Sequence, residues 1–160
     1  GWPNVPLAAS GTGYAMATVV DSIRILNRSL KLTVDTQTLP PRQQVELDLR
    51  SMPYALTNLL RNGLKYAKTE IRVSAEVVGD RISIHVDDDG LGVPVEERRR
   101  IFFAFTRLDR SRDRATGGHG LGLAIVRLVL EQHDGSASVD DSPLGGARFT
   151  LTWPMLHSVT

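Results

Sequence analysis

The chain has 160 residues, of which 41% are hydrophobic and 23% are charged, and its formal net charge is +1. This length and balance predict one folded domain with a core of its own and exclude a disordered chain. The near-neutral charge indicates no general attraction to nucleic acid, and the absence of cysteine excludes disulfides, thiolate catalysis and zinc fingers. No apolar run approaches the ~20 residues of a membrane helix, so we expect no direct contact with a membrane.

The first predicted helix begins near Tyr14, because glycines interrupt the helical spacing before that residue. We therefore expect residues 1–13 to be a linker or a cloning remnant. Residues 14–156 are expected to form the domain, and residues 157–160 a tail.

Two short strands and a long helix follow. Alternating apolar and polar residues predict the strands at residues 30–34 and 45–47. Asp48 or Ser51 then caps a helix, in which Pro53 is tolerated because it lies in the first turn. A leucine stripe on this helix is expected to face the core.

A β-hairpin is predicted after the helix. Residues 69–77 and 81–86 alternate around the turn Val78-Gly79-Asp80, which is typical of two paired strands. Pro94 then precedes residues 95–102, for which we predict a helix. The arginines of this helix are flanked by glutamates and are expected to lie on a solvated face.

The last predicted elements are a helix and a second hairpin. Apolar residues at helical spacing predict the helix at residues 120–133, closed by Gly135. Residues 136–139 and 147–153 are the predicted hairpin strands, with residues 143–146 as the turn. Together the elements predict an α+β fold: a two-layer α/β sandwich in which helices cover one face of one mixed sheet.

One face of the long helix carries polar side chains suited to a nucleotide. Four of them stand at positions i, i+4, i+7 and i+8, opposite the leucine stripe. They are Asn58, Asn62, Lys65 and Tyr66. Two amides, an ammonium and a phenol in one line suit a triphosphate, a hard cation and a purine, and Mg²⁺ accepts an amide oxygen beside phosphate oxygens. The alternative is an exposed polar helix face with an ordinary lysine and tyrosine.

A carboxylate at the end of a predicted strand is a second candidate. Asp88 precedes Gly90 and Gly92, which let the backbone approach a ligand and adopt φ values that other residues resist. A buried carboxylate there can accept a hydrogen bond from the exocyclic amine of adenine and so select adenine over guanine. We expect the neighbouring Asp87 and Asp89 to point to solvent.

A run of glycines precedes the last predicted helix, whose first N–H groups can bind phosphate. The run consists of Gly117, Gly118, Gly120 and Gly122. It is neither a Rossmann fingerprint, because no βαβ unit surrounds it, nor a Walker A loop, because no Gly-Lys-Ser/Thr ends it. Arginines just before the run are candidate phosphate ligands. They are Arg107, Arg110, Arg112 and Arg114.

Four motifs therefore occur in a fixed order, at residues 58–62, 88–92, 102–105 and 118–122. As a set they resemble the N, G1, F and G2 boxes of the catalytic, ATP-binding domain of bacterial two-component sensor histidine kinases. This ATPase group also holds DNA gyrase B, Hsp90 and MutL. The resemblance runs from about residue 48 to residue 154 and implies the Bergerat-type ATP-binding fold. The arginine-rich segment resembles the ATP lid of RstB-type sensors.

The resemblance implies ATP and Mg²⁺ as cofactors. Asn62 would be the Mg²⁺ ligand, Lys65 would touch the phosphates and Tyr66 would lie on the adenine. The implied cofactor-binding residues are Asn62, Tyr66, Asp88, Gly90, Gly92, Gly118, Gly120, Leu121 and Gly122. The implied catalytic residues are Asn58, Lys65, Arg107 and Arg114. Phe102 and Phe105 would anchor the lid, although apolar packing alone explains them equally well.

Two positions depart from the pattern. Asn58 stands where the ATPases of the wider group carry a glutamate that activates water, and an amide is no general base. We therefore expect poor hydrolysis and presentation of the γ-phosphate to another nucleophile. Ala147 stands where many relatives place a threonine near the adenine aspartate, so one hydroxyl contact is expected to be lost.

None of the four histidines lies in the helical setting of a phosphoacceptor. The resemblance therefore implies transfer to a histidine on the separate dimerisation and phosphoacceptor domain of the same kinase, with a response regulator as an indirect partner. It also implies a cytoplasmic domain of an inner-membrane sensor, monomeric and inactive when isolated. The alternatives are a stand-alone relative, such as an anti-sigma-factor serine kinase, and a pseudokinase module that binds nucleotide without transfer.

Overall fold

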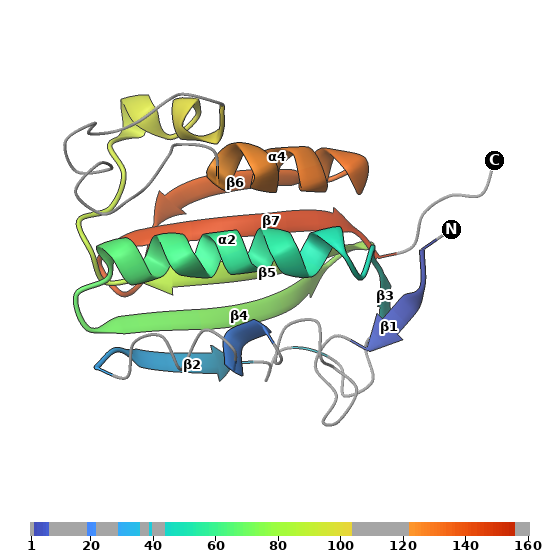
Figure 1. Cartoon of the computed structure of the whole chain (residues 1–160), viewed down its shortest axis with the longest axis horizontal. Helices are drawn as coiled ribbons and strands as arrows, with labels where there is room; N and C mark the ends of the chain where they lie inside the picture. Colours follow the sequence, from blue (N-terminus) through green and yellow to red (C-terminus); the bar gives the residue numbers. More distant parts are fainter. Residues whose placement is uncertain are drawn as a thin grey trace.

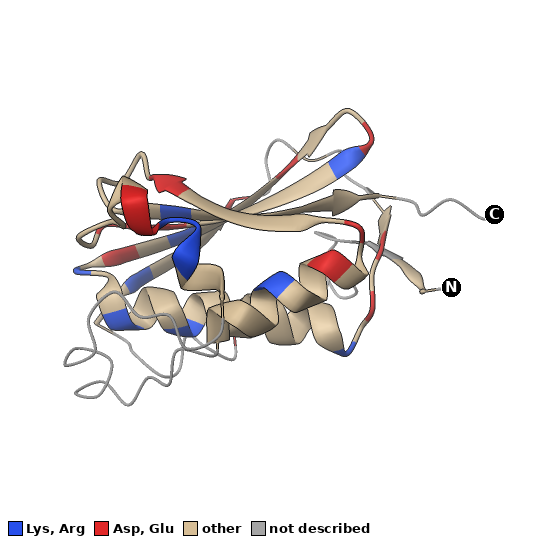
Figure 2. Ribbon diagram, turned by 90° about the horizontal axis from the view of Figure 1, so that it is seen from above, with Lys and Arg blue, Asp and Glu red and all other residues tan. Residues whose placement is uncertain are grey.

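In the computed structural model, a mixed five-stranded sheet carries helices on one face (Figure 1). The structure describes residues 2–6, 19–21, 29–35, 39, 44–103 and 122–155. The elements of the two layers are β2 (Lys31–Asp35), α2 (Ser51–Tyr66), β4 (Glu70–Val78), β5 (Arg81–Asp88), α4 (Gly122–Gln132), β6 (Ser136–Asp141) and β7 (Ala147–Pro154). Figure 2 shows α2 and α4 side by side along the same face of the sheet. The predicted α+β fold is confirmed.

The sheet has the order β2-β4-β5-β7-β6. Strand β2 runs parallel to β4, and every other neighbouring pair is antiparallel. Both predicted hairpins are present, and Gly79 takes the left-handed φ of +63° in the first turn. A separate two-stranded sheet pairs β1 (Asn4–Pro6) with β3 (Gln44–Glu46). The segment predicted as a linker thus contains a strand.

Helix α2 begins immediately after a turn that Asp48 stabilises. Oδ1 of Asp48 accepts the backbone N–H of Arg50 at 3.1 Å, and Oδ2 accepts the hydroxyl of Ser51 at 2.8 Å. These two hydrogen bonds lower the pKa of Asp48. Pro53 lies in the first turn, as predicted, where no intrahelical N–H is lost.

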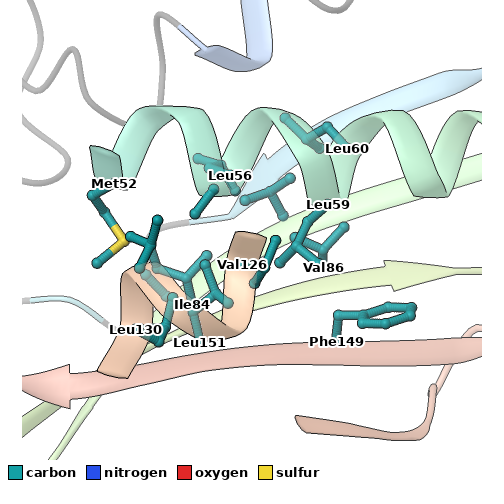
Figure 3. Packing of buried hydrophobic residues seen from close by; sticks show 14 of the residues in the cluster. Met52, Leu56, Leu59, Leu60, Ile84, Val86, Val126, Leu130, Phe149 and Leu151 are labelled. Atoms are coloured by element: carbon teal, nitrogen blue, oxygen red, sulfur yellow. The ribbon is translucent and has the colours of Figure 1, made fainter. Parts of the chain in front are cut away.

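The core lies between the two helices and the sheet (Figure 3). Apolar side chains from α2, α4 and the central strands meet there because their spacing follows the period of each element. Those labelled in Figure 3 are Met52, Leu56, Leu59, Leu60, Ile84, Val86, Val126, Leu130, Phe149 and Leu151. The leucine stripe of α2 is thus buried, and its polar face is turned away from this core.

Helix α4 ends in a turn that Gly135 closes, as predicted. Asp134 takes the left-handed φ of 57°, and the N–H of Gly135 donates to the carbonyl of Leu130 at 2.7 Å. A Cβ on Gly135 would lie 2.1 Å from the carbonyl oxygen of Thr152. Glycine is required here because the chain passes so close to β7.

The prediction of a helix at residues 95–102 is wrong. Two short 3₁₀ turns, η1 (Val95–Glu97) and η2 (Arg100–Phe102), take its place. Between them, Arg98 makes two contacts outside the segment: its Nε donates to the carbonyl of Val93 at 2.9 Å and its Nη2 pairs with Asp141 at 2.8 Å. These contacts with residues outside the segment favour the tighter turns. Arg98 is half-buried, whereas Arg99 and Arg100 are exposed, as predicted for a solvated face.

Candidate functional site

Asp88, the last residue of β5, is a buried carboxylate with one oxygen already bound. Only 3% of the residue is exposed. Oδ1 accepts the N–H of Gly90 at 2.9 Å and the N–H of Ala147 at 3.2 Å, whereas Oδ2 accepts no hydrogen bond from the described part of the chain. Burial raises the pKa of Asp88, and the two backbone hydrogen bonds oppose this shift. Oδ2 is therefore the oxygen through which a ligand could hydrogen-bond.

Glycines surround this carboxylate because no side chain fits beside it. A Cβ on Gly90 would lie 2.2 Å from the carbonyl oxygen of Tyr66, and one on Gly146 would lie 2.3 Å from Oδ1 of Asp88. Gly92 takes the left-handed φ of +77°. Gly146 was not among the predicted site residues, although its place in a Gly-Gly turn before Ala147 was the available signal.

The polar face of α2 links this cluster to the start of α4. Tyr66 lies at the Asp88 end, beside Gly90, and the ammonium of Lys65 lies 5.6 Å from the centre of the Tyr66 ring. At the other end, Oδ1 of Asn58 lies 3.2 Å from the position that a Cβ on Gly122 would occupy. Nδ2 of Asn58 donates to the carbonyl of Tyr54 at 2.9 Å.

Asn62 lies half-buried between these two ends, one helical turn after Asn58. Asn58 and Tyr66 are eight residues apart, which is about 12 Å along a helix axis. The structure therefore brings the predicted residues of α2, the end of β5 and the start of α4 into one continuous region.

The expectation that Asp87 and Asp89 point to solvent is wrong for Asp87, and Asp89 is half-exposed with its carboxylate bound to the backbone. Asp87 is only 1% exposed and accepts hydrogen bonds from Arg148 and from Ser142. Asp89 accepts the backbone N–H groups of residues 68–70 at 2.8–3.2 Å, together with the hydroxyl of Thr69. The hydroxyl of Thr69 and these N–H groups hold the pKa of Asp89 well below its usual range.

Several predicted site residues lie outside the described residues. They are Arg107, Arg114, Gly118, Gly120 and Leu121. Phe105 lies outside them as well, whereas Phe102 is buried and packs edge-on against Phe149, with ring centres 6.0 Å apart. In the part of the chain that the structure describes, no three His, Cys, Asp or Glu side chains form a group that could hold a metal ion. There too, no helix is both long enough and apolar enough to cross a membrane.

Residues 47–157 match the family model of the histidine kinase-, DNA gyrase B-, and HSP90-like ATPases. The chain is 45% identical over 127 residues to sensor protein RstB of Escherichia coli (strain K12), covering 79% of this chain and 29% of RstB. It is 50% identical over 101 residues to sensor histidine kinase CpxA of the same organism, covering 63% of this chain and 22% of CpxA. The chain thus spans less than a third of either relative.

Among solved structures, the ATP-binding domain of PrrB from Mycobacterium tuberculosis has a TM-score of 0.72 and 26% identity. The match covers 89% of this chain and 93% of that one. The mycobacterial sensor histidine kinase MprB shares the fold, with a TM-score of 0.78 at 23% identity and coverage of 96% and 97%. Sequence and fold agree with the four motifs. The chain therefore belongs to the histidine kinase-, DNA gyrase B- and HSP90-like ATPase family, as an ATP-binding catalytic domain of the sensor histidine kinase type.

Proposed function

We propose that the domain binds Mg-ATP and donates the γ-phosphate to a histidine on a separate dimerisation and phosphoacceptor domain of its parent kinase. The observation that carries the proposal is the carboxylate of Asp88. Its Oδ1 is held by two backbone N–H groups and its Oδ2 accepts none from the described residues. The glycines beside it leave no room for a Cβ, as expected where a flat base approaches the backbone.

Adenine is the base that fits this acceptor. An ionised carboxylate only accepts hydrogen bonds, and adenine offers an exocyclic amine where guanine offers an oxygen. Guanine would place its oxygen against the carboxylate, leaving both groups unpaired in a buried site. The backbone carbonyl of Tyr66 lies beside Gly90, and we assign the Tyr66 ring to the face of the adenine.

The phosphates are assigned to the other end of the α2 face. The N-terminus of α4 begins at Gly122, and free N–H groups at a helix N-terminus favour anions. Lys65 lies on the same face of α2 at its Tyr66 end, from which its long side chain would reach the phosphates. Asn62 would hold Mg²⁺ through its amide oxygen, and the bound ion would neutralise phosphate charge. Arg107 and Arg114 are assigned to the γ-phosphate, and Gly118, Gly120 and Leu121 to the phosphate chain.

The transfer breaks the bond between the γ-phosphorus and the oxygen that bridges to the β-phosphate, and forms a bond to an imidazole nitrogen of the acceptor. ADP leaves with the bridging oxygen, and the imidazole loses its proton to water or to the acceptor domain. Asn58 cannot take a proton from water, so hydrolysis is slow and the γ-phosphate is kept for the acceptor. Positioning and charge neutralisation by this domain lower the barrier.

In the whole protein, we assign this domain to the cytoplasmic side of an inner-membrane sensor, with a response regulator as the eventual acceptor. Residues 14–156 are assigned to the domain, and β1 is added to it because this strand pairs with β3. The names of the relatives, sensor protein RstB and sensor histidine kinase CpxA, support its place in a sensor kinase.

The test is labelling with γ-labelled ATP. Mixed with the cognate dimerisation domain, the chain should transfer label to that domain's histidine, and the label should be lost in acid. An Asp88→Asn chain is the matched negative control. Acid-stable label on a serine of a third protein would favour a stand-alone serine kinase. Nucleotide binding without any transfer would favour a pseudokinase module, and rapid hydrolysis by the isolated chain would contradict the role of Asn58.

A further inference from the structure

A buried carboxylate with a half-buried arginine partner lies directly beside Asp88 and has no assigned role. Asp87 in β5 faces Arg148 in β7, its partner in the strand register. Nε and Nη2 of Arg148 donate to Oδ1 and Oδ2 of Asp87 at 2.8 and 3.1 Å. The hydroxyl of Ser142 adds a third hydrogen bond at 2.8 Å. A buried carboxylate with three donors has a single favourable orientation, because any rotation would leave one of its hydrogen bonds unmade.

Ser142 connects this cluster to the turn between β6 and β7. Its hydroxyl oxygen accepts the N–H of Leu144 at 3.0 Å, and its own N–H donates to the carbonyl of Gly146 at 2.9 Å. The N–H of Gly146 donates in turn to the carbonyl of Asp88 at 3.1 Å. The turn is therefore tied to β5 at two neighbouring residues, Asp87 through its side chain and Asp88 through its backbone.

We infer that Asp87, Arg148 and Ser142 are positioning residues for Asp88. They hold the turn so that the N–H of Ala147 stays on Oδ1 of Asp88, which directs Oδ2 toward adenine. The inference rests on the proposed function, because it deepens the adenine specificity of that same site. The inference also explains why the Asp87–Arg148 pair is placed here. Ala147 directly precedes Arg148, so holding the Arg148 side chain on Asp87 also restrains the N–H of Ala147.

A matched control lies two residues away on the same strands. Nδ1 of His85 in β5 and the hydroxyl of Thr150 in β7 are 2.9 Å apart, and these two residues are also register partners. Side chains two residues apart in a strand share a face, so this pair lies on the same side of the sheet as Asp87 and Arg148. It has no hydrogen bond to the turn among those that the structure gives.

The test compares Ser142→Ala, Asp87→Asn and the control Thr150→Val. Amide hydrogen exchange at Ala147 is measured without nucleotide, and the affinities for Mg-ADP and for inorganic tripolyphosphate are measured at a temperature where each variant is folded. Ser142→Ala should speed exchange at Ala147 and weaken ADP about 2- to 12-fold, the range for one lost hydrogen bond. Tripolyphosphate affinity should not change, since the base contact alone is disturbed. Thr150→Val should alter neither quantity.

Unchanged exchange at Ala147 in both Ser142→Ala and Asp87→Asn would overturn the inference. Equal weakening of ADP and tripolyphosphate would also overturn it, because a general loosening of the domain would then explain the result. If the unaltered chain binds no ADP, the proposed function fails. The exchange measurement still decides in that case whether the cluster positions Ala147. Ser142→Ala keeps the buried ion pair, so the test stands even if Asp87→Asn does not fold.

Discussion

Replacing Asp88 by asparagine should separate nucleotide binding from stability. Oδ1 of Asp88 is the acceptor for two backbone N–H groups, at 2.9 and 3.2 Å. In the Asp88→Asn variant, the side-chain carbonyl oxygen must therefore occupy the Oδ1 position, and the side-chain NH₂ must occupy the Oδ2 position. A donor then faces the amine of adenine where an acceptor stood before.

The size of the effect follows from the contact that is lost. A hydrogen bond to a charged group is worth about 1.5–3 kcal/mol, so Mg-ADP should bind roughly 10- to 150-fold more weakly. The amide NH₂ can donate to the oxygen of guanine, so the preference for ADP over GDP should fall further. Titration calorimetry with both nucleotides measures this, and the exposed Asp80→Asn is the control.

The stability of the Asp88→Asn variant should not fall with its ADP affinity. Burial raises the pKa of Asp88, so ionisation is less favourable in the folded state than in the unfolded chain. The resulting cost is absent below the unfolded pKa of ~3.9 and complete above the folded pKa. At pH 7, Asp88→Asn removes this cost, and the variant should melt at the same temperature or higher. Unchanged ADP affinity, or a melting temperature several degrees lower, would refute this reasoning.

Three further predictions concern other contacts. Gly146→Ala should abolish ADP binding and destabilise the domain, since its Cβ would lie 2.3 Å from a carboxylate oxygen of Asp88. The control is Gly145→Ala, at φ +104° with open space around the new Cβ. It should lower the free energy of unfolding by about 1 kcal/mol and retain binding in the same titration. Asp89 has a lowered pKa, so its stabilisation is present above pH ~3.9 and lost as the pH falls further. In urea unfolding, Asp89→Asn should therefore destabilise the domain at pH 7 and progressively less as the pH is lowered from ~4 toward ~2, and a destabilisation that does not change over this range would contradict this. Trp2→Ala removes a stack on His133, with ring centres 4.0 Å apart. His133 follows α4 and accepts the N–H of Asp48 just before α2, at the opposite end of that helix from Asp88. Trp2→Ala should lower the melting temperature without weakening ADP, and a weaker ADP affinity would show that the two ends are coupled.

The local parts of the fold were predictable from sequence. Hairpin turns and periodicity depend on neighbouring residues, so β4, β5, β6 and β7 agree with prediction to within about two residues at each boundary. The spacing of Asn58 and Tyr66 on one helix face was predictable for the same reason. The parallel pairing of β2 with β4 has no such local signal, because it depends on a crossover through distant elements.

The partners of charged residues were the part that sequence could not supply. Asp87 looked like a solvent-exposed neighbour of Asp88, yet its partner Arg148 lies 61 positions away. Asp89 accepts N–H groups from a segment about 20 positions earlier in the chain. The helix predicted at residues 95–102 was wrong for a related reason, since Arg98 is held by Asp141, 43 positions away. Long-range hydrogen bonds outweighed local preference at each of these places.

The most direct test of the central claim is the thermal stability of this chain with Mg-ATP and with Mg-GTP. A ligand at about 100 times its dissociation constant adds ~2.7 kcal/mol, which corresponds to about 5–10 °C for a domain of this size. Mg-ATP should produce a shift of that order, and Mg-GTP at the same concentration should produce a much smaller one, because guanine has an oxygen at the position where adenine offers its exocyclic amine to Asp88. Equal shifts with the two nucleotides, or no shift with Mg-ATP, would contradict the assignment of Asp88 as the adenine-binding residue.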